Sequence, residues 1–195
     1  MNQNKSRAKE AYFLTFIHLW ETKPFEEITV SEIISESSYC KAGFYRYFHD
    51  KFDLAEQLFQ REAIEYIDSI IYGLLKYTNS ADRTKDIISY PVLQHVYEHK
   101  NLYHLIINSN IPDLNLDYFC SYALKVFWEN KTFVINTKNT IIDPEFFYFC
   151  TTRQFIQYIC YWDYIRYSKS AKYMSKQVSC MMESNEPGYL FSTNR

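Results

Sequence analysis

The sequence predicts an all-α protein in which a small N-terminal domain of three helices precedes a larger helical bundle. Glycine accounts for only 3 of the 195 residues and proline for 5, so tight hairpin turns are scarce and long helices are favoured. Apolar residues recur mostly at the helical spacing of three and four positions. The length accommodates both domains, which we expect at 1–50 and 51–195.

The first two helices are predicted from local chemistry. A helix over about 5–21 is expected because apolar or small residues share one face: Ala8, Ala11, Tyr12, Thr15, Phe16 and Leu19. Thr29 and Glu32 then form a capping box, in which the threonine hydroxyl accepts the Glu32 N–H and the glutamate reaches back to the Thr29 N–H. A short second helix is expected to follow.

A turn and a third helix come next. Residues 37–40 are small or polar and favour a turn, and Phe44 and Phe48 beyond them repeat at i and i+4 toward the core. Lys41, Ala42, Tyr45 and Arg46 remain on the outer face and first turn, where the small Ala42 and Gly43 allow close approach to base edges. This order of parts is typical of a helix-turn-helix that enters the DNA major groove.

Residues 7–59 resemble the N-terminal domain of the TetR/AcrR family of bacterial transcriptional regulators. The resemblance rests on the segments Thr29–Ile33, Cys40–Phe48 and Lys51–Leu54. It implies a homodimeric regulator whose C-terminal domain binds a small molecule and thereby changes the spacing of the two DNA-binding heads. In that family, residues at the positions of Thr29, Lys41, Tyr45, Tyr47 and Lys51 touch phosphates or bases.

Three positions depart from the family pattern. Ser38 stands where the family has a turn glycine, Cys40 where it has a capping serine, and Ala42-Gly43 where it has Gly-Thr. A cysteine accepts hydrogen bonds weakly, so we expect Cys40 to cap poorly. The full set of candidate DNA contacts is Thr29, Lys41, Ala42, Gly43, Tyr45, Arg46, Tyr47 and Lys51. The alternative for the two tyrosines is that they only cover the core.

Charge gives no global indication of nucleic-acid binding. The chain carries a net charge of −2, and residues 1–66 hold 8 Lys and Arg against 11 Asp and Glu. Positive charge is local: Lys5, Arg7, Lys9, Lys41, Arg46 and Lys51. Such patches predict a modest salt dependence of DNA binding. Cys40, Ser38 and the near-neutral head also leave open a second interpretation, a TetR-fold regulator that acts through a protein partner rather than an operator.

Further helices are expected along the rest of the chain. Their predicted ranges are 51–76, 83–99, 101–108, 113–130, 143–167 and 170–183, with a connecting loop at 131–142. Asp143 and Pro144 form a strong helix start, as an N-cap acceptor followed by proline in the first turn.

The last two predicted helices carry more apolar side chains than one face of each can bury. We therefore expect a four-helix interface between two copies of the chain, as the resemblance also implies, with these residues in it: Phe155, Trp162, Met174, Val178 and Met181. The alternative is that the aromatic residues thicken the core of a single chain. The same aromatic content is compatible with a small hydrophobic or aromatic effector.

His95 and His99 match the H-x-x-E-H pattern of some zinc proteases. Only His104 and Asp113 suggest themselves as a third ligand, so we interpret the pair as an exposed helix face and expect no metal, cofactor or enzymatic activity. The five cysteines are widely spaced and suit a reducing cytoplasm. No apolar stretch has the length of a membrane span. The sequence thus predicts a cytoplasmic homodimeric repressor that binds a palindromic site in double-stranded DNA.

Overall fold

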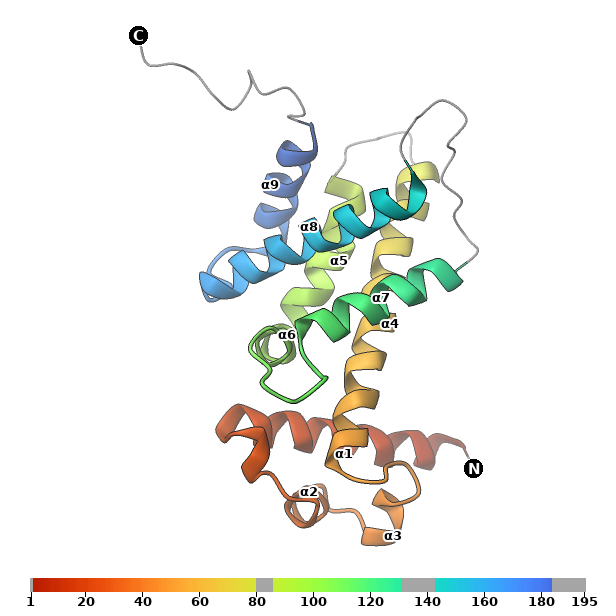
Figure 1. The fold of residues 1–195 in the computed structure, drawn as a ribbon, viewed down its shortest axis with the longest axis vertical. Coiled ribbons are helices and arrows are strands. Elements are labelled where there is room, and N and C mark those ends of the chain that lie inside the picture. Colours follow the sequence, from red (N-terminus) through yellow and green to blue (C-terminus); the bar gives the residue numbers. More distant parts are fainter. Residues whose placement is uncertain (1, 80–85, 131–142, 184–195) are drawn as a thin grey trace. The chain divides into compact units, whose positions relative to one another are not determined.

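The computed structural model describes residues 2–79, 86–130 and 143–183, and the regular elements in these ranges are helices (Figure 1). The fold class predicted from the sequence is therefore confirmed. The described residues form two compact units. Of the described residues, we call those within 2–63 and 101–122 the head unit, and those within 64–79, 86–100, 123–130 and 143–183 the body unit.

The head unit begins with four helical segments. These are α1 (Asn2–Thr22), the 3-10 helix η1 (Phe25–Glu27), α2 (Val30–Glu36) and α3 (Lys41–Phe44). The first half of α4 (Lys51–Asn79) follows, and α6 (Lys100–Ile107) and α7 (Leu116–Glu129) contribute their parts within 101–122. The first turns of α4 belong to the head unit, and Leu54, Leu58 and Phe59 in these turns are fully buried.

Aromatic rings fill the core between α1, α3 and α4. Tyr12 meets Phe44 edge-on at 5.4 Å between ring centroids, and Phe13 meets Phe48 at the same distance. Trp20 stacks on Phe59 of α4 at 6.2 Å. Aromatic pairs of this kind contribute about 0.5–1.5 kcal/mol beyond their buried area. They fix the position of α3 on the head unit.

The body unit contains α5 (Asp86–Glu98), α8 (Pro144–Tyr164), α9 (Ala171–Glu183) and the remaining parts of α4 and α7. The predicted N-cap of α8 is confirmed, since the Asp143 carboxylate accepts the backbone N–H of Phe146 at 2.9 Å. The predicted loop at 131–142 and the predicted start of a helix at residue 83 lie outside the described residues. None of the described helices has the length and apolar composition of a membrane-spanning segment.

Three residues predicted to lie in a dimer interface are instead core residues of the body unit. Trp162, Met174 and Val178 are at most 4% exposed within a single chain, so they offer no surface to a second one. The Trp162 ring stacks on Tyr97 of α5 at 5.6 Å, and its indole N–H donates to the Lys169 carbonyl at 3.0 Å. The apolar stripe of α9 packs against α5, where the hydroxyl oxygens of Ser89 and Ser175 lie 2.9 Å apart.

Of the other two predicted interface residues, Phe155 is half-buried and Met181 is exposed. Helical periodicity located the apolar stripes but could not tell which of them face the chain's own core. Among the side chains of these helices that the structure describes, the large exposed ones are Phe146, Phe149, Tyr161, Tyr164, Tyr173 and Met181.

Candidate nucleic-acid interface

The predicted capping box at the start of α2 is present. The Thr29 hydroxyl accepts the Glu32 N–H at 3.2 Å, and the Glu32 carboxylate accepts the Thr29 N–H at 2.9 Å. Lys23 donates to the same carboxylate at 2.6 Å. The bond from Lys23, followed by those from Thr29, lowers the pKa of the Glu32 carboxyl to about 2. The start of α2 is therefore held by a three-residue polar cluster on the surface of the head unit.

The turn between α2 and α3 contains a strained serine. Ser38 has φ 60°, the left-handed region that glycine adopts without cost. Its neighbour Ser37 keeps a helical φ of −69° and donates its hydroxyl to the Ile34 carbonyl at 3.0 Å. The turn thus keeps a glycine-like backbone at the position where the resembling family has glycine, although this chain has serine.

Cys40 is the N-cap residue of α3, and its side chain makes no capping hydrogen bond, as we expected from the sequence. Its carbonyl instead accepts the Gly43 N–H at 2.9 Å, the Phe44 N–H at 3.2 Å and the Tyr12 hydroxyl of α1 at 3.0 Å. Burial, together with the neighbouring Cys40, raises the pKa of Tyr12, so this hydroxyl stays a donor. A buried tyrosine of α1 therefore anchors the first turn of α3.

The predicted third helix ends before Phe48, so Phe44 and Phe48 do not lie on one helix. α3 ends at Phe44, and the chain continues as a turn through Tyr47, whose N–H donates to the Phe44 carbonyl at 2.9 Å. Phe44 and Phe48 are both buried, as predicted. Because the two phenylalanines hold both ends of this segment, the short helix and the turn after it present a fixed outer surface.

The residues predicted to contact DNA differ in their exposure to solvent. Lys41, Ala42, Tyr45, Arg46 and Thr29 are exposed, and the Tyr45 side chain is 51% accessible. The Lys41 ammonium lies 5.9 Å from the Tyr45 ring centroid. Four of these residues thus form one exposed surface at α3, which we call the α3 face: Lys41, Ala42, Tyr45 and Arg46.

Gly43 and Tyr47 are only half-exposed. A Cβ atom at Gly43 would lie 2.7 Å from the Tyr12 hydroxyl. The missing side chain therefore leaves space for Tyr12 of α1, not for DNA. The sequence predicts that Gly43 allows close approach to base edges. Its contact with Tyr12, 31 positions earlier, cannot be predicted from local spacing.

Lys51 occupies a different position from the one suggested by the resemblance. Its ammonium donates to the carbonyls of Phe25, Glu26 and Ile28 at 2.8, 3.0 and 2.9 Å. It also lies 4.5 Å from the centroid of the Phe25 ring. An ammonium has three N–H donors, and all three point at η1 and the residue after it. Lys51 therefore joins the start of α4 to η1.

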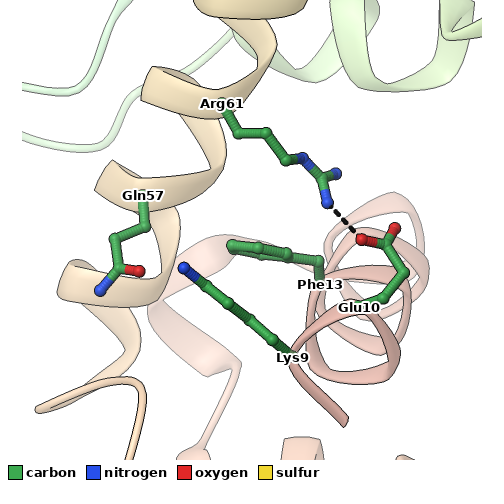
Figure 2. Close-up of a pocket in the computed structure, with 5 residues that line it drawn as sticks. All are labelled: Lys9, Glu10, Phe13, Gln57 and Arg61. Carbon is green, nitrogen blue, oxygen red and sulfur yellow. Dashed lines mark hydrogen bonds and ion pairs between the residues drawn. The ribbon is translucent and has the colours of Figure 1, made fainter. Parts of the chain in front are cut away.

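A hollow of about 240 Å³ lies between α1 and α4 within the head unit (Figure 2). Arg61 of α4 pairs with Glu10 of α1 at 2.6 Å and lies 4.4 Å from the Phe13 ring centroid. The Lys9 ammonium points past this ring and lies 5.7 Å from the Phe48 ring, at the end of the turn after α3. Lys9, predicted only as part of a basic N-terminal segment, therefore lies against the aromatic core of the head unit.

A second hollow, of about 500 Å³, is lined by several carboxylates of the head unit, among them Asp50, Asp53, Glu56 and Asp113. The Asp50 carboxylate accepts the N–H groups of Phe52 and Asp53 at 2.8 and 2.9 Å and caps α4. A surface of this charge repels phosphates.

Comparison with known proteins supports the fold. No family model matches the sequence, and no curated protein matches it. Two solved structures are similar over nearly the whole chain. A protein described as a TetR-family transcriptional regulator, from Syntrophomonas wolfei, is 19% identical with a TM-score of 0.70, over 93% of this chain and 95% of that one. The fatty acid degradation regulator FadR from Bacillus halodurans is 13% identical with a TM-score of 0.66, over 92% and 96%. The chain therefore has the fold of TetR-type regulators.

Proposed function

We propose that this protein is a transcriptional regulator that binds double-stranded DNA through the α3 face of its head unit. The observation that carries the proposal is the separation of side chains along residues 41–48. Phe44 and Phe48 are buried, whereas Lys41, Ala42, Tyr45 and Arg46 are exposed on a short helix and the turn directly after it. This segment follows a capped helix and a tight turn. This arrangement, in a chain with a TetR-type fold, is what major-groove recognition requires.

Each residue of the α3 face has a distinct role in the proposed complex. Arg46 and Lys41 donate to phosphates or to guanine acceptors, and Tyr45 contacts a base edge or the sugar-phosphate backbone. Ala42 leaves room for the backbone of α3 to approach the groove. Thr29 is exposed at the N-terminus of α2, although its hydroxyl also donates to Glu32 at 2.8 Å. Tyr47 is a peripheral contact, and Lys51 supports the head unit rather than the DNA.

The proposal includes a homodimer on a palindromic operator. The exposed side chains at the ends of α8 and α9 supply a hydrophobic surface for a second copy: Tyr161, Tyr164, Tyr173 and Met181. Tyr164 is 82% exposed, which is high for an aromatic residue. A symmetric interface through this surface would bring two heads onto two half-sites. We expect Tyr164→Glu to weaken the dimer in sedimentation, whereas Tyr72→Glu, at an exposed tyrosine of α4, should leave it intact.

The regulator is proposed to act in the cytoplasm as a repressor released by a small hydrophobic or aromatic effector. The aromatic content of the body unit supports this class of effector. A coupling of about 1–3 kcal/mol between effector and DNA would give a 5- to 150-fold change in affinity.

A regulator that acts through a protein partner is the second candidate. It is favoured by the acidic balance of residues 1–66 and by the engagement of Lys51 with three carbonyls, which together leave few cations for phosphates. The two candidates predict different results with DNA.

The test is selection of bound sequences from a random duplex pool with the full-length protein, followed by titration of the selected duplex at several salt concentrations. A DNA-binding regulator should enrich a palindromic sequence and lose affinity as salt rises, with a slope set by the few phosphates it contacts. A pool with no enriched sequence, at salt low enough to detect non-specific binding, would contradict the proposal and favour the protein-partner alternative.

A further inference from the structure

Three side chains of the body unit that can ligate a metal converge between α4 and α5. The ligand atoms of Glu65, His95 and His99 all lie within 4.8 Å of one another. All three residues are half-buried, so the two histidines do not form the solvent-exposed helix face that we expected from the sequence. Glu65 lies 30 positions before His95, so no local spacing in the sequence relates the two residues.

We infer that Glu65, His95 and His99 form a binding site for a divalent transition-metal ion such as Zn²⁺. Residues at i and i+4 lie on one face of a helix, and the His95 and His99 ring centroids are 4.4 Å apart. Two imidazoles and one carboxylate form a donor set found in zinc sites and in non-haem iron sites.

The packing of the two helices explains why these residues meet. A Cβ atom at Gly73 of α4 would overlap the backbone carbonyl oxygen of Ile88 of α5, so the glycine lets the two backbones come into direct contact. Glu65 lies eight residues before Gly73, and His95 lies seven residues after Ile88. Two helices in contact at Gly73 and Ile88 and running in opposite directions therefore bring Glu65 to the level of His95.

The geometry suits an ion after small side-chain rotations. Zinc bonds to nitrogen and oxygen of about 2.0–2.1 Å in a tetrahedral site place neighbouring ligand atoms about 3.3 Å apart. A spread of up to 4.8 Å among the three ligand atoms can be reduced to this by χ rotations of the side chains, without moving α4 or α5.

The ligand types also restrict which metal ions can bind. Imidazole favours zinc, copper, iron and nickel, whereas magnesium and calcium prefer oxygen ligands. We therefore expect Zn²⁺ to bind in the presence of excess Mg²⁺. The inference does not depend on DNA binding, because it concerns residues of the body unit alone.

The experiment is calorimetric titration of chelator-treated full-length protein with Zn²⁺. The parent protein should bind one equivalent per chain, and His95→Ala, His99→Ala and Glu65→Gln should each weaken binding by at least about tenfold. Two matched controls should bind as the parent does. Glu98→Gln removes a carboxylate of α5 that accepts a hydrogen bond from Gln94, and His104→Ala removes a histidine of the head unit.

Two further measurements separate loss of the site from loss of the fold. Circular dichroism should show the same helix content for all five variants. Co²⁺ should give the visible bands of a four- or five-coordinate site without the charge-transfer absorption of thiolate ligands, which excludes the cysteines. Absence of stoichiometric Zn²⁺ binding by the parent, or undiminished binding by folded His95→Ala and His99→Ala, would overturn the inference.

Discussion

The hydroxyl of Tyr12 on α1 lies where a side chain at Gly43 on α3 would have to go. A Cβ atom at residue 43 would be 2.7 Å from the Tyr12 hydroxyl oxygen, which itself donates to the Cys40 carbonyl at 3.0 Å. The first turn of α3, which begins the α3 face, is thus positioned by one buried tyrosine. The absence of a side chain at Gly43 is a packing requirement of the head unit.

Gly43→Ala should destabilise the head unit by about 1–3 kcal/mol, because the new methyl group overlaps a fully buried side chain. Tyr12→Phe removes the overlapping oxygen and should cost about 1 kcal/mol through the lost hydrogen bond. In urea unfolding, the double variant should be more stable than the sum of the two single effects predicts. Strict additivity would mean that the two residues do not compete for the same space.

Lys51→Ala should destabilise the head unit by about 1.5–3 kcal/mol, because it removes a charged donor shared by three carbonyls. Lys41→Ala, at an exposed lysine of the α3 face, should leave the urea midpoint nearly unchanged. If Lys51→Ala proves as stable as the parent and yet binds DNA weakly, Lys51 is a DNA contact as the family resemblance implies.

Ser38→Gly should stabilise the protein by up to about 1 kcal/mol, because glycine adopts the left-handed backbone at φ 60° without the clash of a Cβ atom. The same substitution at the neighbouring Ser37 should destabilise it. Ser37 has an ordinary helical φ, and its hydroxyl donates to Ile34. Thermal denaturation of the two variants compares them directly, and equal shifts in the same direction would contradict the assignment of strain to Ser38.

The Glu32 carboxyl should titrate with a pKa of about 2, below its ordinary value of 4.5, because Lys23 and Thr29 donate hydrogen bonds to its charged form. A pKa lowered by folding adds stability that is complete above about 4.5 and lost as the pH falls toward 2. The stability difference between the parent and Glu32→Gln should therefore shrink over this range. NMR of the Glu32 carboxyl carbon can follow the titration, and Lys23→Ala should raise the measured pKa. A pKa near 4.5 in the parent would mean that Lys23 and Thr29 do not bind the Glu32 carboxylate in solution.

Local chemistry in the sequence was enough to predict part of the head unit. The Thr29–Glu32 capping box involves residues three positions apart, and the buried Phe44 and Phe48 are four positions apart, so both follow from short-range rules. The role of Lys51 could not be predicted, because its carbonyl partners belong to residues 23 to 26 positions earlier in the chain.

The same limit applies to the body unit. Periodicity identified an apolar stripe that includes Met174, but not that α5 covers it. The pairing of Glu65 with His95 depends on the contact between Gly73 and Ile88, which no local pattern contains. Contacts between helices distant in sequence thus determine which apolar stripes are buried and which polar side chains meet.

The most direct test of the proposed function is the affinity of folded variants of the α3 face for a duplex selected with the parent protein. We expect Tyr45→Ala and Arg46→Ala each to lose about 1–3 kcal/mol of binding where the side chain contacts a base edge, with unchanged urea midpoints. Tyr72→Ala and Lys172→Ala, exposed residues of the body unit, should bind as the parent does. Parent-like affinity of both α3-face variants would contradict the assignment of this surface to DNA.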